Sequence, residues 1–327
     1  MPQFDLPLKA LQNYLPARDE PTDFDAFWHA TLSETRQVDL AATFVEVHAG
    51  YTELITEDVT FAGFGGHPIK GWMLRPRHAV ELLPVVVTYV GYGGGRGLLS
   101  EWTGIPSAGF AHFVMDLRGQ GAGHRTGDTA DGDLSGPHFG GFLTLGIDDP
   151  QNYYYRRLFT DAVRAVEAAQ SHPAVDRSRT ILSGGSQGGG IALASAALSP
   201  AVATHAPIGV VVDVPFLADI RRATEIVNTA PYSELVRYFT TRRHCEEAAF
   251  RTLSYFDGVN FAARAHLPAL FSVGLFDEIC PPSTVYAAFN HYAGEKVMIV
   301  YPYNGHENGG PFQDAEHLAF FNGLLGR

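Results

Sequence analysis

The stretch TILSGGSQGGGIALASAAL, residues 180–198, decides the predicted fold. It begins as an apolar strand, TILSG (180–184), and ends as an apolar helix. Between them Gly184-Gly185-Ser186-Gln187-Gly188 fits G-x-S-x-G, a sharp strand-to-helix turn that requires small flanking residues. Ser186 is therefore a candidate nucleophile at a helix N-terminus, where the helix dipole favours developing negative charge. A glycine-rich turn with an incidental serine is the alternative, and the strand and helix on either side disfavour it.

Further apolar runs of strand length surround this motif, at 83–90, 110–117, 208–214, 267–276 and 296–303. They are almost continuously apolar, as is typical of parallel strands covered on both faces. Helical patterns lie between them, including 156–170 and the helix that Pro281 and Pro282 open. The alternation predicts one doubly wound, mostly parallel α/β domain over residues 1–327.

Three segments depart from this alternation. Residues 1–60 are predicted to form a helical N-terminal extension, with Thr22 as a candidate N-cap. A strand pair, 57–64 and 67–77, is predicted around Gly65-Gly66, where glycine suits a tight hairpin. Residues 217–265 separate two strands and carry a charged, aromatic helical pattern, so we expect a short inserted cap segment.

Composition excludes several classes of protein. The 327 residues are 46% hydrophobic and 18% charged, which excludes intrinsic disorder. The net charge of −12 disfavours nucleic acid and anionic membranes as partners and favours small-molecule ligands. The N-terminal sequence lacks the pattern of a signal peptide, no run is long enough to span a membrane, and the only cysteines are Cys245 and Cys280. A cytoplasmic protein is expected.

A serine is a weak nucleophile unless a base accepts its proton, and that base is expected to be a histidine oriented by a carboxylate. In folds with this serine turn the chain order is serine, acid, histidine, each after a strand. His306 is the one histidine downstream of Ser186 that directly follows a predicted strand. Two acids compete for the third position, Asp277 and Asp213. Asp277 is favoured because it leaves a strand end into a helix-starting loop, whereas a structural role suits Asp213 better.

An oxyanion formed on the substrate needs two hydrogen-bond donors. One is expected from the backbone N–H of Gln187, and the other from the glycine-rich loop after residue 90, where the Tyr92 N–H is the candidate. Other signals are weak. The glycine clusters complete neither a dinucleotide-binding nor a P-loop motif, and His306, Glu307 and His317 match no zinc motif. Neither a metal nor an organic cofactor is expected, and Cys280 is expected to be a buried small apolar residue.

These motifs together resemble the acetyl xylan esterases and cephalosporin-C deacetylases, carbohydrate esterase family seven. The resemblance is carried by Asp116-Leu117-Arg118-Gly119-Gln120-Gly121, by the serine turn, by His306-Glu307, and by Gly91-Tyr92, 153–156, 277–285 and 23–28. It implies an α/β-hydrolase that removes acetyl groups from short xylo-oligosaccharides and from cephalosporin C. It also implies a cytoplasmic homo-hexamer with active sites facing an inner cavity.

Carried over by residue, the resemblance makes Ser186 the nucleophile, Asp277 the acid and His306 the base, with Tyr92 and Gln187 as oxyanion donors. Arg118 and Gln120 fall in a motif that we interpret as bracing the active-site loops. Two other functions are weighed: a general short-chain carboxylesterase or a peptidase-like serine hydrolase on the same fold, and a non-enzymatic scaffold. The sequence contains no repeat with the period of a β-propeller domain, which disfavours the peptidase. All three candidate catalytic residues are present, which disfavours the scaffold, so an esterase is favoured.

Overall fold

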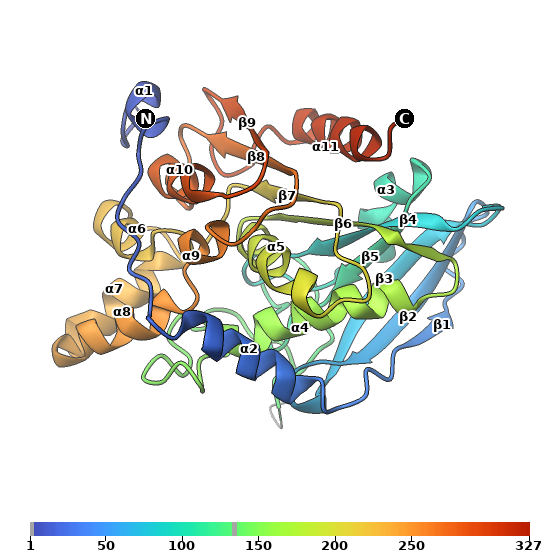
Figure 1. Cartoon of the computed structure of the whole chain (residues 1–327), viewed down its shortest axis with the longest axis horizontal. Coiled ribbons are helices and arrows are strands. Elements are labelled where there is room, and N and C mark those ends of the chain that lie inside the picture. The colour runs from blue at the N-terminus through green and yellow to red at the C-terminus, as the bar shows by residue number, and fades with distance from the viewer. Residues whose placement is uncertain (1–2, 133–135) are drawn as a thin grey trace.

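A single nine-stranded sheet forms the centre of the molecule in the computed structural model, which describes residues 3–132 and 136–327 (Figure 1). The strand order is β1-β2-β3-β5-β4-β6-β7-β8-β9. The strands are β1 (Thr43–Glu46), β2 (Leu54–Ala62), β3 (Pro68–Pro76), β4 (Leu83–Tyr89), β5 (Ala111–Met115), β6 (Val175–Gly185), β7 (Gly209–Asp213), β8 (Ala269–Gly274) and β9 (Lys296–Tyr301).

The sheet changes direction at β3. Strands β1, β2, β3 and β5 pair antiparallel, whereas β5, β4, β6, β7, β8 and β9 pair parallel. All six parallel strands lie where apolar runs predict them, with ends that differ by a few residues. Strand β6 differs more, because it begins at Val175 rather than Thr180. The predicted hairpin between β2 and β3 is confirmed, and Gly65 and Gly66 turn it with φ of 64° and 78°.

Helices cover both faces of the sheet. Helices α4 (Tyr154–Ser171) and α5 (Gln187–Leu198) pack along one face, with α10 (Pro282–His291) beside them. Within the described residues, the opposite face carries α3 (Gly104–Ser107), a single turn, the short 3-10 helix Leu99–Trp102 beside it, and α11 (Pro311–Leu324). The buried side chains accordingly form a large apolar cluster on the first face and a small one on the second. The second face is thus thinly covered, which matters for the pocket described below.

The N-terminal sixty residues are helical only in part. They hold α1 (Leu8–Leu11) and α2 (Phe24–Thr35), but also β1 and the start of β2, so the prediction of a wholly helical extension is wrong. The N-cap prediction at Thr22 is wrong as well, because Asp23 occupies that position. The Asp23 carboxylate does not cap the helix, since it accepts a hydrogen bond of 2.6 Å from the Tyr255 hydroxyl instead. Packing against a distant segment has overridden local capping.

The segment 217–265 lies between β7 and β8 and is helical, as predicted. It holds α6 (Ile220–Ile226), α7 (Tyr232–Thr241), α8 (Glu246–Ser254) and α9 (Gly258–Ala262). In Figure 1 these helices extend beyond the carboxyl ends of the parallel strands, next to α2. None of the helices in the described ranges is long and apolar enough to cross a membrane.

Candidate active site

Ser186 occupies the sharp turn between β6 and α5. Its φ of 59° and ψ of −124° lie in a region that residues other than glycine rarely adopt, which is how the turn projects the side chain. The flanking glycines have a steric reason. A Cβ on Gly184 would lie 2.1 Å from the Gly188 carbonyl oxygen, and one on Gly188 would lie 2.1 Å from that of Tyr89. The G-x-S-x-G spacing is thus a packing requirement of this turn.

His306 and Asp277 meet above this turn. The Asp277 carboxylate is fully buried, and its Oδ2 lies 2.8 Å from His306 Nδ1. Its Oδ1 accepts the backbone N–H groups of Ile279 and Cys280 at 2.8 and 2.9 Å. Because a carboxylate can only accept, Nδ1 of His306 carries a proton and Nε2 is left free to accept one. This is the tautomer that a general base needs.

Asp213, the competing acid, lies at the end of β7 in a different environment. It accepts hydrogen bonds from the Ser272 hydroxyl at 2.5 Å, from Gln313 Nε2 at 2.8 Å and from His317 Nε2 at 2.7 Å. His317 belongs to α11, so Asp213 ties that helix to the sheet. No bond joins Asp213 to His306 within the described part of the chain. The geometry favours Asp277 as the partner of the candidate base.

Two backbone N–H groups are available for an oxyanion. Those of Tyr92 and Gln187 donate no hydrogen bond among the residues that the structure describes. Both residues are held by their neighbours. The side chain of Gln120 accepts the Gly93 N–H at 2.7 Å and donates to Gln187 Oε1 at 3.0 Å, so one side chain joins the two loops. Tyr155 also donates to Gln187 Oε1, at 2.8 Å.

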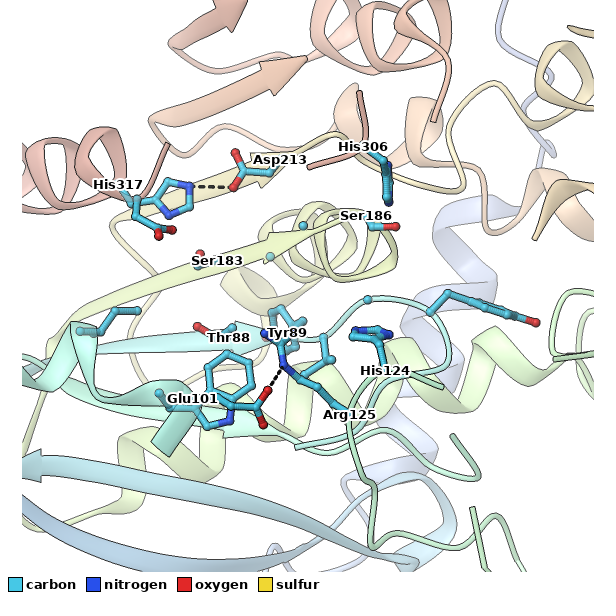
Figure 2. Close-up of a pocket in the computed structure, with 18 of the residues that line it drawn as sticks. Thr88, Tyr89, Glu101, His124, Arg125, Ser183, Ser186, Asp213, His306 and His317 are labelled. Atoms are coloured by element: carbon cyan, nitrogen blue, oxygen red, sulfur yellow. Dashed lines mark hydrogen bonds and ion pairs between the residues drawn. The ribbon is translucent and has the colours of Figure 1, made fainter. Parts of the chain in front are cut away.

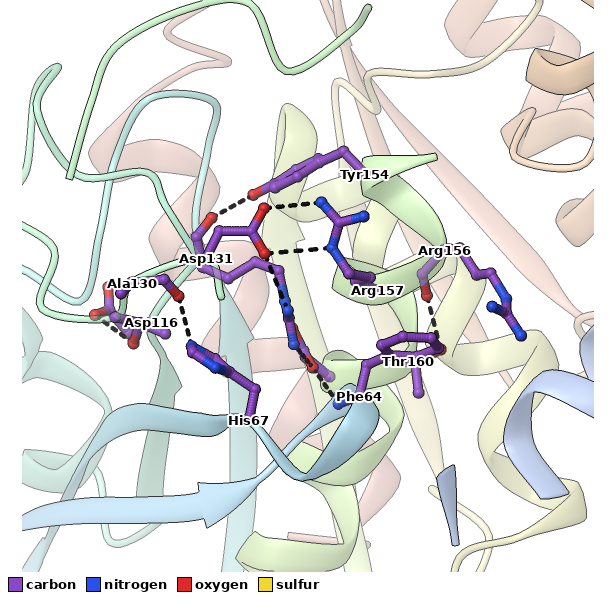
Figure 3. Close-up of polar contacts among 12 residues, drawn as sticks. Phe64, His67, Asp116, Ala130, Asp131, Tyr154, Arg156, Arg157 and Thr160 are labelled. Carbon is purple, nitrogen blue, oxygen red and sulfur yellow. Dashed lines mark hydrogen bonds and ion pairs between the residues drawn. The ribbon is translucent and has the colours of Figure 1, made fainter. Parts of the chain in front are cut away.

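Arg118 braces this region from below. It forms a two-point ion pair with Asp161, at 2.5 and 2.8 Å, and a bond of 3.1 Å to Asp131. Asp131 also accepts a hydrogen bond of 2.8 Å from Arg157 Nη2, which Figure 3 shows. Burial lowers the pKa of Arg118, but the two carboxylates outweigh it and raise that pKa, so the guanidinium stays charged. Its backbone carbonyl accepts the Tyr154 hydroxyl at 2.7 Å, and that hydroxyl in turn accepts Gln120 Nε2.

A cavity of about 810 Å³ contains the serine and the histidine (Figure 2). It has two parts. Toward the inserted segment it is lined by Tyr92, Phe139, Ala230, Pro231 and Ile279. In the other direction it continues across the face of the sheet toward α3 and α11, where it is lined by Thr88, Ser183, Asp213, His317, Glu101 and Arg125. The first part is lined mostly by apolar side chains together with Glu234, whereas the second combines its polar residues with Trp102, Ile105, Leu318 and Phe321.

Two residues of the cavity wall escape prediction from sequence. Glu234, in α7, accepts hydrogen bonds from the Tyr92 hydroxyl at 2.7 and 2.9 Å and from the Gly141 N–H at 2.9 Å, so it joins the Tyr92 loop to the inserted segment. His124 lies below Ser186 in Figure 2. Burial and the charge of Arg125 lower the pKa of His124, which favours a neutral ring. The sequence does offer one indication of His124, because it lies in the same glycine-rich stretch as Arg118 and Gln120. No feature of the sequence indicates Glu234.

One group of side chains could be considered for a metal ion. The ligand atoms of Asp277, Cys280 and His306 lie within 4.8 Å of one another. Both oxygens of Asp277, however, already accept hydrogen bonds from protein groups. Burial raises the pKa of the Cys280 thiol well above its usual value, which disfavours the thiolate that binds metals. These residues suit a catalytic pair better than a metal centre.

Comparison with known proteins places the chain in a family. The family model for acetyl xylan esterase (AXE1) matches residues 1–324. The acetyl esterase Axe7A of Xylanibacter ruminicola is 30% identical over 304 residues, covering 89% of this chain and 64% of that protein. This chain thus spans less than two thirds of that curated relative.

Solved structures agree with this placement. The acetyl xylan esterase from Paenibacillus sp. R4 is 39% identical, with a TM-score of 0.89 over 97% of this chain and 99% of that one. Acetyl xylan esterase 1 from Thermoanaerobacterium sp. is 33% identical, with a TM-score of 0.87 over 98% and 99%. The α/β-hydrolase GrgF from Penicillium sp., at 18% identity and a TM-score of 0.58 over 83% and 99%, shares the fold alone. The chain therefore belongs to the acetyl xylan esterase family of carboxylic ester hydrolases, built on the α/β-hydrolase fold.

Proposed function

We propose that this chain is a serine esterase that removes acetyl groups from acetylated xylo-oligosaccharides and from small acetyl esters such as cephalosporin C. The observation that supports this most is the contact of 2.8 Å between His306 Nδ1 and a fully buried Asp277, in a cavity that also holds Ser186. Membership of the acetyl xylan esterase family supports the acyl group and the sugar.

The proposed reaction has two halves. Ser186 Oγ attacks the ester carbonyl carbon while His306 Nε2 accepts the serine proton. The resulting oxyanion receives hydrogen bonds from the N–H groups of Tyr92 and Gln187. His306 then donates its proton to the leaving alcohol oxygen, and an acetyl-serine remains. A water molecule then attacks the acetyl-serine in the same way, with His306 accepting its proton and returning it to Ser186 Oγ. Acetate and free Ser186 are the products.

The acyl group is proposed to lie in the apolar part of the cavity. Tyr92 stands on the side of the oxyanion loop, and Pro231 and Ile279 form the other walls. Four hydrogen bonds involving Glu234, Gly141, Phe142 and Leu143 hold the Tyr92 hydroxyl and the neighbouring loop in place, so this wall is stiff. A stiff pocket rejects longer acyl chains by overlap, which outweighs about 0.8 kcal/mol gained for each buried methylene.

Acetyl esters are therefore expected to be the best substrates. We expect kcat/KM to fall from p-nitrophenyl acetate to the butyrate and to be barely measurable for the octanoate. The first turnover of p-nitrophenyl acetate is expected to appear as a burst if the acetyl-enzyme accumulates. A maximum at butyrate or longer would contradict the acetyl assignment and favour a general carboxylesterase. Cleavage of a matched p-nitroanilide at a comparable rate would favour a peptidase-like hydrolase.

Activity is expected not to need a metal ion. Because Asp277 and His306 are occupied with each other and Cys280 is held as a thiol, EDTA should leave the hydrolysis of p-nitrophenyl acetate within about twofold of the untreated rate. The measurement is the initial rate after dialysis against EDTA, with and without added zinc. Loss of activity that zinc restores would contradict the serine mechanism as drawn.

The resemblance also leads us to propose a cytoplasmic homo-hexamer, with small esters as its ligands and neither nucleic acid nor membrane as a partner. The net charge of −12 supports the exclusion of nucleic acid. The mass in solution, measured by light scattering, and fractionation of the producing cells test these two proposals.

A further inference from the structure

One face of the sheet changes from apolar to polar along each of four adjacent strands. Toward the amino ends, β4, β6, β7 and β8 place apolar side chains there, and two residues further each places a polar one on the same face. The pairs are Val86 and Thr88, Ile181 and Ser183, Val211 and Asp213, and Leu270 and Ser272. Register aligns the polar residues in two pairs, Thr88 with Ser183 and Asp213 with Ser272. The second pair lies two residues further along the strands, because Asp213 pairs with Gly185 and not with Ser183.

Three residues of this polar row, Thr88, Ser183 and Asp213, line the cavity, whereas Ser272 is buried and donates to Asp213. The apolar row below it is covered by Phe110 and by Phe321 of α11. Above it, α3 is a single turn, so the gap between α3 and α11 stays open. Thr88, Ser183, Asp213 and His317 line the resulting arm of the cavity, as Figure 2 shows. A packed core would place aliphatic residues here, whereas a site for a hydrogen-bonding ligand needs polar ones.

Thr88 presents an acceptor to this arm. His112 is buried beneath it, and His112 Nδ1 lies 3.1 Å from the Trp102 carbonyl oxygen, which can only accept. Nδ1 therefore carries the proton, and burial lowers the pKa of His112 to about 4, which leaves Nε2 unprotonated. Nε2 lies 2.9 Å from Thr88 Oγ1 and must accept its hydrogen. The lone pairs of Thr88 Oγ1 then remain for a ligand.

Ser183 and His317 add donors beside it. Ser183 Oγ has no hydrogen-bond partner among the described residues, so its hydroxyl can donate or accept. His317 donates Nε2–H to Asp213, and Nδ1 has no partner in the described part of the chain. Burial lowers the pKa of His317, but the Asp213 carboxylate outweighs it and the net pKa is raised. Nδ1 is thus available to a ligand, as a donor when the ring is protonated and as an acceptor when it is neutral.

We propose that Thr88, Ser183 and His317 form a subsite that binds hydroxyl groups of the alcohol part of the substrate. Acceptors and donors stand side by side, and a sugar hydroxyl, which is both donor and acceptor, matches them. A leaving group with several hydroxyls, such as a pyranose unit, is therefore the one that this subsite favours. A cephem acetate offers this row fewer matching groups. The inference rests on the proposed esterase function.

Position separates this subsite from the acyl pocket. Ser183 lies within β6, and Ser186 lies in the turn just beyond its end, so the rise of a strand sets an upper limit of about 10 Å between their Cα atoms. The subsite is therefore within reach of the alcohol part of an ester bound at Ser186. The acyl pocket lies in the other part of the cavity, beside Tyr92, Pro231 and Ile279.

The test compares two substrates that yield the same acetyl-enzyme. Acetylated xylobiose and p-nitrophenyl acetate share the deacylation step, so the ratio of their kcat/KM values reports recognition of the alcohol. We expect Thr88→Val and Ser183→Ala each to lower this ratio about fivefold, as loss of one hydrogen bond does. Free xylobiose is expected to inhibit p-nitrophenyl acetate hydrolysis with a Ki about fivefold higher in both variants.

Two control variants and the wild type distinguish failure of the subsite from failure of the proposed function. Thr88→Ser keeps the hydroxyl and should keep the wild-type ratio, as should Ser107→Ala, whose hydroxyl bonds to Thr103 outside the cavity. Ser183→Ala carries the test if loss of the partner of His112 prevents Thr88→Val from folding. Ratios within twofold of wild type for the folded Thr88→Val and Ser183→Ala variants overturn the subsite alone. A wild type that cleaves neither ester overturns the proposed function instead.

Discussion

Replacing Ser186 by alanine is expected to lower kcat for p-nitrophenyl acetate by about 10⁶-fold, to the level of hydrolysis by the remaining oxyanion donors. The substitution removes the atom that forms the acetyl ester and leaves everything else in place. Alanine keeps the Cβ, so the strain of a φ of 59° at this position is unchanged. The thermal unfolding midpoint is therefore expected to stay close to that of the wild type.

Two measurements make this result specific to the nucleophile. A serine-directed organophosphate is expected to add one phosphoryl group to the wild type, on the peptide that contains residue 186, and none to Ser186→Ala. Ser107→Ala, an exposed serine on α3, serves as the matched control and is expected to behave as the wild type in both assays. A folded Ser186→Ala protein that turns over within tenfold of the wild-type rate would refute the assignment.

Sequence predicts the parts of this site that depend on neighbours along the chain. The strand, turn and helix around Ser186 are encoded within residues 180–198, and the close contact of Gly184 with Gly188 is made inside that stretch. The loops after β8 and β9 follow from apolar runs that end at known positions. Because parallel strands bring their carboxyl ends to one edge, Asp277 and His306 could be expected to meet there.

Contacts between distant segments are what sequence does not predict. Glu234 holds the Tyr92 hydroxyl across 142 positions, and nothing near either residue indicates the partner. Strand β1 is short and mostly exposed, so its pairing of Thr43 with Thr60 is decided by the neighbouring strand rather than by its own pattern.

The polar row on the sheet shows the same limit for a binding site. Within a single strand, Thr88 or Ser183 is an ordinary interruption of an apolar run. The row exists only because register sets Thr88 beside Ser183 and Asp213 beside Ser272. The cover matters as much, since a longer helix in place of the one-turn α3 would fill the gap. The proposed alcohol subsite thus depends on sheet register and helix length together.

Asp277→Asn is expected to lower kcat by about 10⁴-fold, because asparagine selects the wrong tautomer of His306. The backbone N–H groups of Ile279 and Cys280 need an acceptor, so the amide oxygen will face them. The amide NH₂ then faces His306 Nδ1 and donates to it, which moves the ring proton to Nε2. A histidine protonated at Nε2 cannot accept the proton of Ser186. The measurement is kcat for p-nitrophenyl acetate, together with the thermal unfolding midpoint, which is expected to stay close to that of the wild type.

Asp213→Asn is the matched comparison, and its loss of kcat is expected to be far smaller. The Asp213 carboxylate accepts three hydrogen bonds, from Ser272, Gln313 and His317, and an amide oxygen cannot accept them all. The variant should therefore lose stability, by about 1–3 kcal/mol. Since Asp213 raises the pKa of His317, their pairing stabilises the fold most below the usual histidine pKa of about 6.5, and this contribution is lost as the pH rises through the raised value. The destabilisation should accordingly be larger at acidic than at alkaline pH. If Asp213→Asn instead damages kcat more than Asp277→Asn at unchanged stability, Asp213 is the catalytic acid.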